Sequence, residues 1–294
     1  MIRALRRRPL LSAGAVLIGV QILASILPLR AQSVESEDLS RVSIYHSETV
    51  KLLVTDPFGR RTGLWDPSTF SYLKEIENSN YLDEGVGNRT AMTLYIWREP
   101  AGRFTVTTTG LVTGEFDVGV NTNDANGGSS VYKLFIGTTR AGRTYTYTVD
   151  FSPEPGIKST ILPATYAFGG FRPPLADGAV KNFRKGKPIP IRFSLKRRDG
   201  KRADDVRARL FLIRAIDDKP LEDPLDAFIN IKTGMRDAVV ARPAGEHVGN
   251  RFRYDRTKRW HAYDLSTDYL DTGMWHLLIQ LDDGSVETAR FGLK

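Results

Sequence analysis

The sequence predicts an all-β protein, with two antiparallel β-sandwich modules that follow an amino-terminal signal helix. From residue 41 onward, short segments with alternating apolar and polar side chains follow one another, and turns rich in Gly, Pro, Asp and Asn separate them. The one long apolar run lies at the amino terminus, and no later segment has the 3.6-residue period of a long helix. A chain of 294 residues is long enough for two such modules.

Residues 1–31 have the layout of a secretion signal. Arginines crowd the first eight residues, an apolar run extends from Leu10 to Leu29, and a cleavage site follows at Ala31-Gln32. The run is long enough to span a bilayer, so an uncleaved anchor is the alternative, although the Gly, Gln, Ser and Pro within it favour cleavage. The pair Arg7-Arg8 leaves the Sec and twin-arginine routes both open. We expect a periplasmic or secreted protein, with membrane anchoring through residues 10–29 as the lesser possibility.

Charge and cysteine content exclude several classes of function. The net charge of +8 includes five arginines in residues 1–31, and removal of this segment leaves 37 basic and 34 acidic residues. A net charge of +3 does not indicate a nucleic-acid partner. The chain has no cysteine, so disulfides, thiolate metal sites and a cysteine nucleophile are excluded. Membrane contact is expected only through the signal segment, if it is not cleaved.

The first module is predicted over residues 41–151. Its strands are expected at Val50–Thr55, Met92–Trp97, Phe104–Thr109, Phe116–Val120, Val131–Ile136 and Thr144–Phe151. The sequence Ala-Gly-Arg occurs at 101–103 and again at 141–143, each time before a strand. One such echo indicates a turn type used twice within a sandwich rather than a repeat architecture.

Residues 152–164 are predicted as a linker because Pro153 and Pro155 stiffen the chain and remove hydrogen-bond donors. The second module is predicted over residues 165–294. In its strand at Ile189–Leu195, the prolines at 188 and 190 indicate either an edge strand or the first residues of a strand. A further strand is expected at Ala208–Ile213. The carboxyl end reads as a hairpin, with Asp282-Asp283-Gly284 as the tight turn between two strands.

The second module resembles the bacterial PxKF domain family of extracytoplasmic, immunoglobulin-like modules. The matching stretches occur in order along the chain: Gly169–Pro174, Lys187–Leu195, Phe252–Asp255, Leu281–Gly284 and Phe291–Lys294. The tetrad that names the family corresponds to Pro190, Ile191, Arg192 and Phe193, with arginine where the family has lysine. The resemblance implies an immunoglobulin-like sandwich and a structural role for this tetrad, and it implies no catalytic residue.

No catalytic, cofactor-binding or metal-binding residue is predicted. The four histidines are His46, His247, His261 and His276, and none has the spacing of a metal ligand pair. His261 and His276 each follow a tryptophan, so in a strand each points to the face opposite that tryptophan. We interpret all four as structural or surface histidines.

Two loops have side-chain oxygens that calcium could use. The first contains Asn121, Asn123, Asp124 and Asn126, and the second contains Asp217, Asp218, Glu222, Asp223 and Asp226. Neither has the spacing of a complete calcium loop, so a polar turn and a solvated acidic loop are the favoured interpretations.

A basic stretch and a group of aromatic residues are the remaining binding features. Basic side chains outnumber acidic ones between Arg172 and Arg214, which indicates a solvated turn or a contact with anionic glycans or lipids. The aromatic residues Tyr254, Trp260, Tyr263 and Tyr269 suit sugar or protein contact, and core packing explains them equally well.

These observations favour a non-enzymatic, exported binding or accessory module of the bacterial cell envelope or exterior. Its expected partner is a protein of unknown identity or an envelope glycan. One alternative is a hydrolase of envelope glycans, which requires two carboxyl groups about 5–10 Å apart. Another is an accessory subunit of a separately encoded secreted protein.

Overall fold

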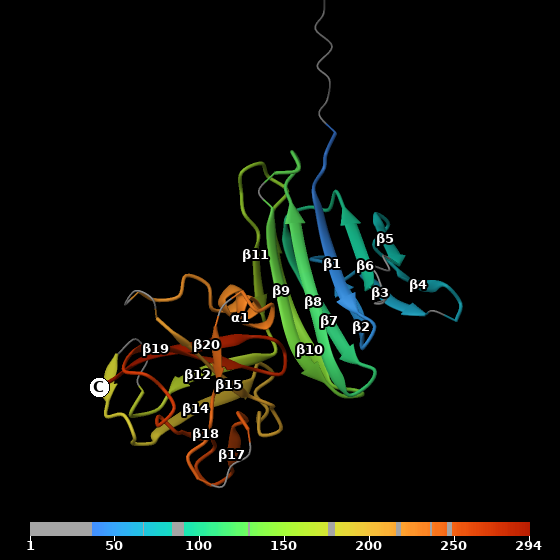
Figure 1. The fold of residues 1–294 in the computed structure, drawn as a ribbon. Helices are drawn as coiled ribbons and strands as arrows, with labels where there is room; N and C mark the ends of the chain where they lie inside the picture. The colour runs from blue at the N-terminus through green and yellow to red at the C-terminus, as the bar shows by residue number, and fades with distance from the viewer. Residues whose placement is uncertain are drawn as a thin grey trace, which may run out of the picture. The chain divides into compact units, whose positions relative to one another are not determined.

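Strands form almost all of the regular structure in the computed structural model (Figure 1). The structure describes residues 37–66, 68–83, 91–128, 130–175, 180–215, 219–235, 237–245 and 249–294. The predicted signal segment, its cleavage site Ala31-Gln32 and His247 lie outside the described residues. Within these ranges, no helix is long and apolar enough to cross a membrane.

Residues 41–163 form two antiparallel sheets that enclose one core. Sheet 1 has the strand order β5 (Ser79–Asp83), β6 (Ala91–Trp97), β1 (Arg41–Ser47), β8 (Gly114–Asn123) and β9 (Val131–Thr139). Sheet 2 has the order β11 (Thr160–Pro163), β10 (Thr144–Phe151), β7 (Gly102–Gly110), β2 (Val50–Thr55), β3 (Arg61–Asp66) and β4 (Ser71–Lys74). Alternate residues of both sheets point inward, and the core contains Ile44, Leu94, Val106 and Tyr147.

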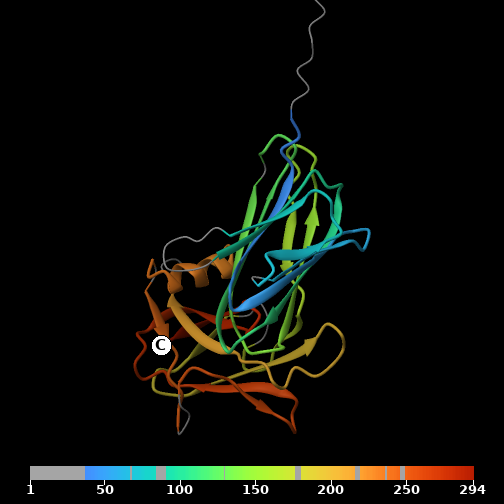
Figure 2. The same ribbon diagram turned by 90° about the vertical axis from the view of Figure 1, so that its right-hand side faces the viewer.

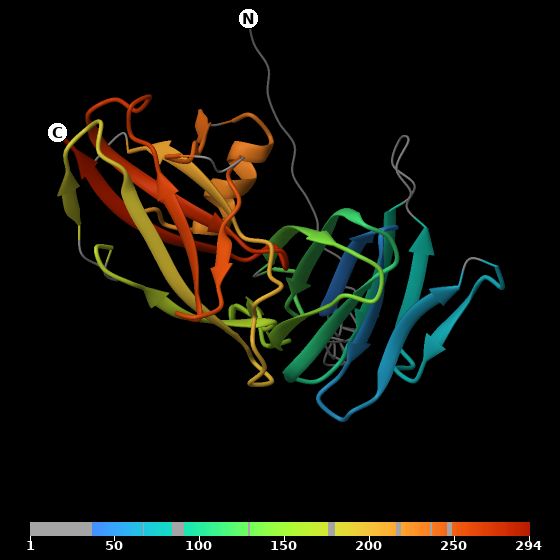
Figure 3. The same ribbon diagram turned by 90° about the horizontal axis from the view of Figure 1, so that it is seen from below.

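Residues 166–293 form a second pair of sheets, which Figure 3 shows as a separate group of yellow to red strands. Sheet 3 has the order β12 (Tyr166–Phe171), β14 (Ile189–Arg197), β18 (Trp260–Leu265) and β17 (Arg253–Asp255). Sheet 4 has the order β13 (Lys181–Phe183), β20 (Val286–Leu293), β19 (Gly273–Gln280), β15 (Arg209–Arg214) and β16 (Ala238–Val240). The pair β13–β20 is parallel, whereas β15, β16, β19 and β20 pair antiparallel. Their core includes Ile191, Phe193, Leu210 and Trp275.

The all-β prediction is confirmed, and the predicted strands coincide with observed ones. Strand β14 is an interior strand between β12 and β18, and Pro190 is its second residue. The prolines therefore mark the first residues of the strand rather than a sheet edge. Strand β11 lies within residues 152–164, the range predicted as a linker, and pairs with β10.

One helix within the described residues, α1 (Pro224–Lys232), was not expected (Figure 2). Asp223 caps it, since its side chain accepts hydrogen bonds from the backbone N–H groups of Leu225 and Asp226, and Pro224 stands in the first turn. The helix buries Leu225, Ala227 and Phe228. An ion pair joins Asp223 to Lys133 of the edge strand β9, so the start of the helix lies beside that edge.

The turn Asp282-Asp283-Gly284 is buried, although the sequence predicts only a tight hairpin turn there. The backbone N–H of Thr138 donates to the carbonyl of Asp282 at 3.0 Å, and the hydroxyl of Tyr147 donates to the carbonyl of Asp283 at 2.7 Å. Gly284 has a φ of +84°, and a Cβ there would meet the backbone N of Ile136 at 2.9 Å. The tip of the β19–β20 hairpin thus packs directly on β9 and β10. We call this contact region the joint.

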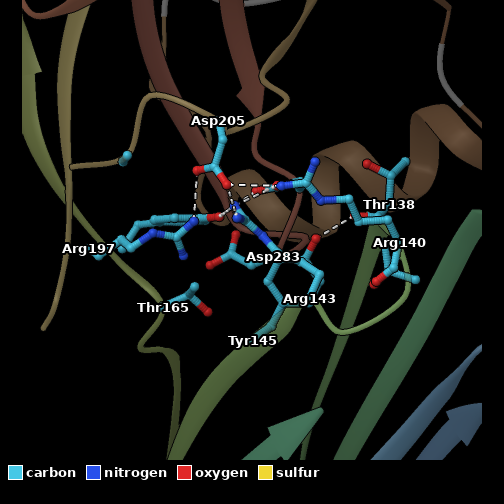
Figure 4. A network of polar contacts seen from close by, with 12 residues as sticks. Thr138, Arg140, Arg143, Tyr145, Thr165, Arg197, Asp205 and Asp283 are labelled. Atoms are coloured by element: carbon cyan, nitrogen blue, oxygen red, sulfur yellow. Dashed lines mark hydrogen bonds and ion pairs between the residues drawn. The ribbon is translucent and has the colours of Figure 1, made fainter. Parts of the chain in front are cut away.

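Charged side chains surround the joint, and Figure 4 shows three arginines that converge on Asp205. Arg143, Arg140 and Arg197 all pair with the carboxylate of Asp205, the last at 2.8 Å. Arg143 also pairs with Asp282 at 3.2 Å. The cavity left among these side chains has a volume of only about 10 Å³, which is room for about one water molecule. The joint is therefore a packed structural contact and has no room for a ligand.

Candidate functional site

Four aromatic side chains lie on the outer face of sheet 1. In β1, Val42 and Ile44 are fully buried in the core, so Ser43 and Tyr45 point to the opposite face. The same alternation in β6 places Leu94 and Ile96 inward. The outward aromatic residues are Tyr45 in β1, Tyr95 and Trp97 in β6, and Tyr132 in β9. We call this surface the aromatic face.

Strand register places these residues in rows that cross the sheet. One row reads Asn80, Tyr95, Ser43, Asn121 and Tyr132, from β5 to β9. The next row contains Trp97, Arg41 and Asn123. Each row therefore combines aromatic rings with side chains that can form hydrogen bonds, and the first row contains no charged residue.

The rings of Tyr95 and Trp97 are stacked, with centroids 5.4 Å apart and planes within 11°. Both side chains are half-buried, and the guanidinium of Arg41 lies 5.9 Å from the centroid of the Tyr95 ring. Stacking and the cation–π contact hold the two rings in fixed positions beside the strand of Arg41. The pair is a preformed aromatic surface at one end of β6.

Tyr132 lies against the sheet because its neighbour has no side chain. A Cβ added at Gly119 would meet the Tyr132 hydroxyl at 2.9 Å and its ring at 3.2 Å. The ring therefore covers Gly119, and Tyr132 remains 56% exposed. Partial burial, with the nearby carboxylate of Asp117, raises the pKa of Tyr132 above its usual value, so its hydroxyl stays protonated at neutral pH. Tyr45 donates its hydroxyl hydrogen to the same carboxylate, at 3.1 Å.

A chain of hydrogen bonds fixes the amide groups of the face. Arg41 Nε and Asn121 Nδ2 both donate to Asn123 Oδ1, at 3.1 Å and 3.3 Å. The hydroxyl of Ser130 donates to Asn121 Oδ1 at 2.7 Å, and Asn123 Nδ2 donates to the carbonyl of Gly127. An amide nitrogen has two hydrogens, so each asparagine keeps one donor that no described residue accepts.

A cleft of about 740 Å³ opens at the end of the aromatic face where Trp97 lies. Arg41, Trp97 and Asn123 belong to both the cleft and the face. The remaining lining residues are mostly polar or charged, namely Glu37, Asp38, Leu39, Lys74, Glu77, Asn78, Ser79, Asn80, Arg98 and Gly127. A half-buried aromatic ring surrounded by polar groups of both charge signs suits a polar ligand that also has an apolar face.

The carboxylates of this cleft have other partners or are exposed. Glu37 pairs with Arg98 at 2.7 Å, and Asp38 Oδ1 accepts the backbone N–H of Ser40 at 2.8 Å. Glu77 is exposed to solvent. A glycosidase acid–base pair needs two carboxyls that converge on one bond, with one of them in an apolar pocket. The described geometry of Glu37, Asp38 and Glu77 does not supply that environment.

The described histidines lie in the interior. His46 is buried and its Nε2 contacts the hydroxyl of Tyr81 at 2.5 Å, and burial lowers its pKa. His261 stacks on Phe193 with centroids 4.8 Å apart, and its Nε2 donates to the carbonyl of Ala203. Burial lowers the pKa of His261 to about 4, so it is neutral at pH 7. His276 is also buried, on the face of β19 opposite Trp275.

The tetrad Pro190, Ile191, Arg192 and Phe193 has a structural place in β14. Ile191 and Phe193 are fully buried in the core. Arg192 donates to the carbonyl of Tyr263 at 2.7 Å and pairs with Asp264 at 2.6 Å, which ties β14 to β18. Three residues of the tetrad therefore anchor β14 in the core and to β18.

The two candidate calcium loops contain carboxylates that organise the backbone. Asp124 accepts hydrogen bonds from the backbone N–H groups of Asn126, Gly128 and Gly156. In the acidic loop, Asp223 caps α1, whereas Asp217 and Asp218 lie outside the described residues. Within the described ranges, no group of three or more acidic or histidine side chains is arranged to hold a metal ion.

The aromatic candidates of the second module do not gather into one exposed surface. Tyr263 is buried in the core, Tyr269 packs against it, and Trp260 lies under the ammonium of Lys258. Reasoning from the sequence missed Tyr45, Tyr95, Trp97 and Tyr132. The alternation in Met92–Trp97 was the available signal, because it places two aromatic rings on the face opposite Leu94 and Ile96.

Comparisons with known proteins give no family for this chain. No family model matches it, and no curated protein matches its sequence. Among solved structures, DIP-gamma IG1+IG2 has 9% identity and a TM-score of 0.21, and it covers 86% of this chain and 88% of its own. The complex of Dpr11 IG1 with DIP-gamma has 7% identity and a TM-score of 0.19, with coverage of 88% and 92%.

A third solved structure, of the titin Ig tandem domains, has 8% identity and a TM-score of 0.21, with coverage of 88% and 90%. At these TM-scores the fold assignment rests on the strand pairing within the chain itself. The resemblance of residues 165–294 to the PxKF family remains a prediction.

Proposed function

We propose that this protein is a non-catalytic, exported binding module that holds a glycan in the cleft beside Trp97. The observation that carries the proposal is the stacked Tyr95–Trp97 pair on the outer face of sheet 1, at the edge of a polar cleft of about 740 Å³. A pyranose ring has an apolar face of C–H groups and a rim of hydroxyls. Trp97 would contact the face, and Asn123, Arg41 and their neighbours would contact the hydroxyls.

A binding role is favoured over hydrolysis by the state of the cleft carboxylates. Glu37 is engaged with Arg98, and Asp38 accepts a backbone hydrogen bond. Amide groups, which bind sugars without acid–base chemistry, line the part of the cleft next to Trp97.

Binding to insoluble polysaccharides tests the proposal. We expect the protein to cosediment with at least one of purified peptidoglycan, chitin and cellulose, and Trp97→Ala to lower the affinity about tenfold or more. Phe58→Ala is the matched control, because Phe58 is an exposed aromatic residue of the same sandwich that does not line the cleft. Equal binding by wild type and Trp97→Ala, or release of soluble sugar by the wild type, would overturn the proposal.

We further propose that the module acts outside the cytoplasm. The arginine-led apolar segment before residue 32 supports this location. Cell fractionation with mass spectrometry of the mature protein is the test. A mature amino terminus near Gln32 is expected, and an intact Met1 in the membrane fraction would instead identify an uncleaved anchor.

A further inference from the structure

We propose that the glycan site extends from the cleft across sheet 1 to Tyr132, so that the protein binds an extended, uncharged glycan of several sugar units. This inference rests on the proposed function and adds the chemical class of the ligand and the direction in which it crosses the sheet. The chain of sugars would cross strands β6, β1, β8 and β9, above the part of the first row that extends from Tyr95 to Tyr132.

The spacing of the two rings in this row supports a ligand longer than one sugar. Tyr95 and Tyr132 are separated by three strand-to-strand steps, which is about 14 Å in a sheet. A single pyranose ring cannot contact both side chains over that distance. A linear oligosaccharide can, with one sugar on each aromatic ring and others between them.

The residues between the two rings suit hydroxyl groups. Asn121 retains one amide hydrogen beyond its bonds to Asn123 and Ser130. The hydroxyl of Ser43 is buried and has no hydrogen-bond partner among the described residues, and the side chain is only 8% exposed. Because the Ser43 oxygen has almost no accessible surface, a sugar hydroxyl could reach it only if a neighbouring side chain moved, so Asn121 is the group between the two rings that is placed to bind a sugar hydroxyl.

The charges near the row favour an uncharged ligand. The row itself contains amides, a serine and tyrosines only. In the adjoining row on one side, Arg41 donates to Asn123 and lies against Tyr95, and two rows away on the other side Asp117 accepts the hydroxyl of Tyr45. Because these two charges already have partners, they offer little to an anionic or cationic chain.

The Tyr132 ring can lie flat on the sheet because Gly119 has no side chain, so a substitution at Gly119 tests whether the position of the ring matters for binding. The added methyl group of Gly119→Ala would push the Tyr132 ring off the sheet, since it would lie 2.9 Å from the hydroxyl oxygen. Gly119 is in the strand β8 and has no positive φ, so alanine causes no backbone strain there. Gly114→Ala is the matched control, because a Cβ at Gly114 in the same strand meets no atom within 4 Å.

The experiment measures affinity for two β-1,4-linked series, chitin oligomers and cello-oligomers, from the disaccharide to the hexasaccharide. We expect wild-type affinity to rise with length. Tyr132→Ala and Gly119→Ala should lower hexasaccharide affinity about fivefold and leave disaccharide affinity unchanged, whereas Tyr132→Phe and Gly114→Ala should behave as wild type. Thermal unfolding and circular dichroism of each variant verify that the fold is retained.

The outcomes separate this inference from the proposed function. If Trp97→Ala weakens binding at every length while the Tyr132 and Gly119 variants bind as wild type, the extended site is wrong and the cleft proposal stands. If Trp97→Ala has no effect, both are wrong. Sedimentation gives a third outcome, since a dimer that Tyr132→Ala dissociates would identify the face as a contact between two copies and overturn the inference.

Discussion

The hydroxyl of Tyr147 donates a hydrogen bond of 2.7 Å to the backbone carbonyl of Asp283, a residue 136 positions further along the chain. Tyr147 belongs to the core of the first pair of sheets, and Asp283 belongs to the hairpin turn of the second. Both residues are buried, so the bond is shielded from water. The hairpin turn of the second sandwich is thereby bonded to a core residue of the first sandwich rather than to a surface residue.

Arg143→Met is expected to weaken the joint strongly. The substitution leaves Asp282 buried without its cationic partner and removes one of three arginines from Asp205. Loss of one partner of a buried ion pair typically costs about 3–5 kcal/mol. Chemical denaturation should show a lower unfolding free energy, with the two sandwiches unfolding in separate steps. Arg103→Met, which removes an exposed ion pair with Asp150, should cost less than about 1 kcal/mol. Equal effects of the two substitutions would contradict a structural role for the joint.

Asp283→Asn should change how stability depends on pH. Burial, with a smaller contribution from the neighbouring Asp282, raises the pKa of Asp283 to about 6, against 3.8 for the free side chain. The folded state therefore binds a proton more readily than the unfolded state, so this group adds stability as the pH falls through about 6 and has added all of it below 3.8. As the pH falls from 7 to 4, the unfolding free energy of the wild type should rise relative to that of Asp283→Asn by on the order of 3 kcal/mol. A constant difference between the two proteins would show that the pKa of Asp283 is the same in the folded and unfolded states.

His261→Gln should reveal a contribution of the opposite sign. Burial lowers the pKa of His261 to about 4, against 6.5 for the free side chain. The unfolded state takes up the proton first, so the stability from this group is lost as the pH falls from about 6.5 toward 4. On acidification, His261→Gln should therefore gain stability relative to the wild type, when each protein is compared with its own value at pH 7. Because His261 and Asp283 act oppositely in nearly the same pH range, the wild-type stability curve should be flatter than that of either variant. A wild-type curve steeper than both would exclude this compensation.

Asp223→Ala should destabilise α1 and uncover the edge strand β9. The carboxylate caps the helix and pairs with Lys133, so its removal should cost about 1–2 kcal/mol. Asp226→Ala is the control, since Asp226 is exposed in the first turn and affects only the helix dipole, which is worth about 0.3–1 kcal/mol. Hydrogen exchange of the amides of β9 is the direct readout, and faster exchange is expected only in Asp223→Ala. Unchanged exchange would mean that the helix does not protect the edge.

The strands of both sandwiches follow from the sequence because apolar alternation and turn residues are local signals. The different environments of the two Ala-Gly-Arg turns cannot be predicted from the sequence in this way. Arg103 forms an exposed ion pair with Asp150, whereas Arg143, in the same local sequence, is buried in the joint. Their difference depends on Asp205 and Asp282, which lie far along the chain, and local sequence contains no information about such neighbours.

The candidate site also has one part that can be predicted from local sequence and another part that cannot. Tyr95 and Trp97 are predictable as outward residues of one strand, since two-residue periodicity fixes their face. That Tyr132 lies in the row of Tyr95 depends on the register of β1, β8 and β9. Helix α1 was missed for a different reason. Asp223-Pro224 is a recognisable helix start, but the helix is short and its acidic sequence also suits a loop.

The burial of the turn Asp282-Asp283-Gly284 has a consequence for the order of assembly. A chain is synthesised from its amino end, so residues 41–163 emerge long before this turn does. Until then, the hydroxyl of Tyr147 and the guanidinium of Arg143 lack the partners that the turn supplies. The contacts of the first sandwich are therefore completed only when the last hairpin of the chain has formed. A protein that loses its carboxyl end would expose the unpaired groups of this surface, and proteases can recognise such a surface.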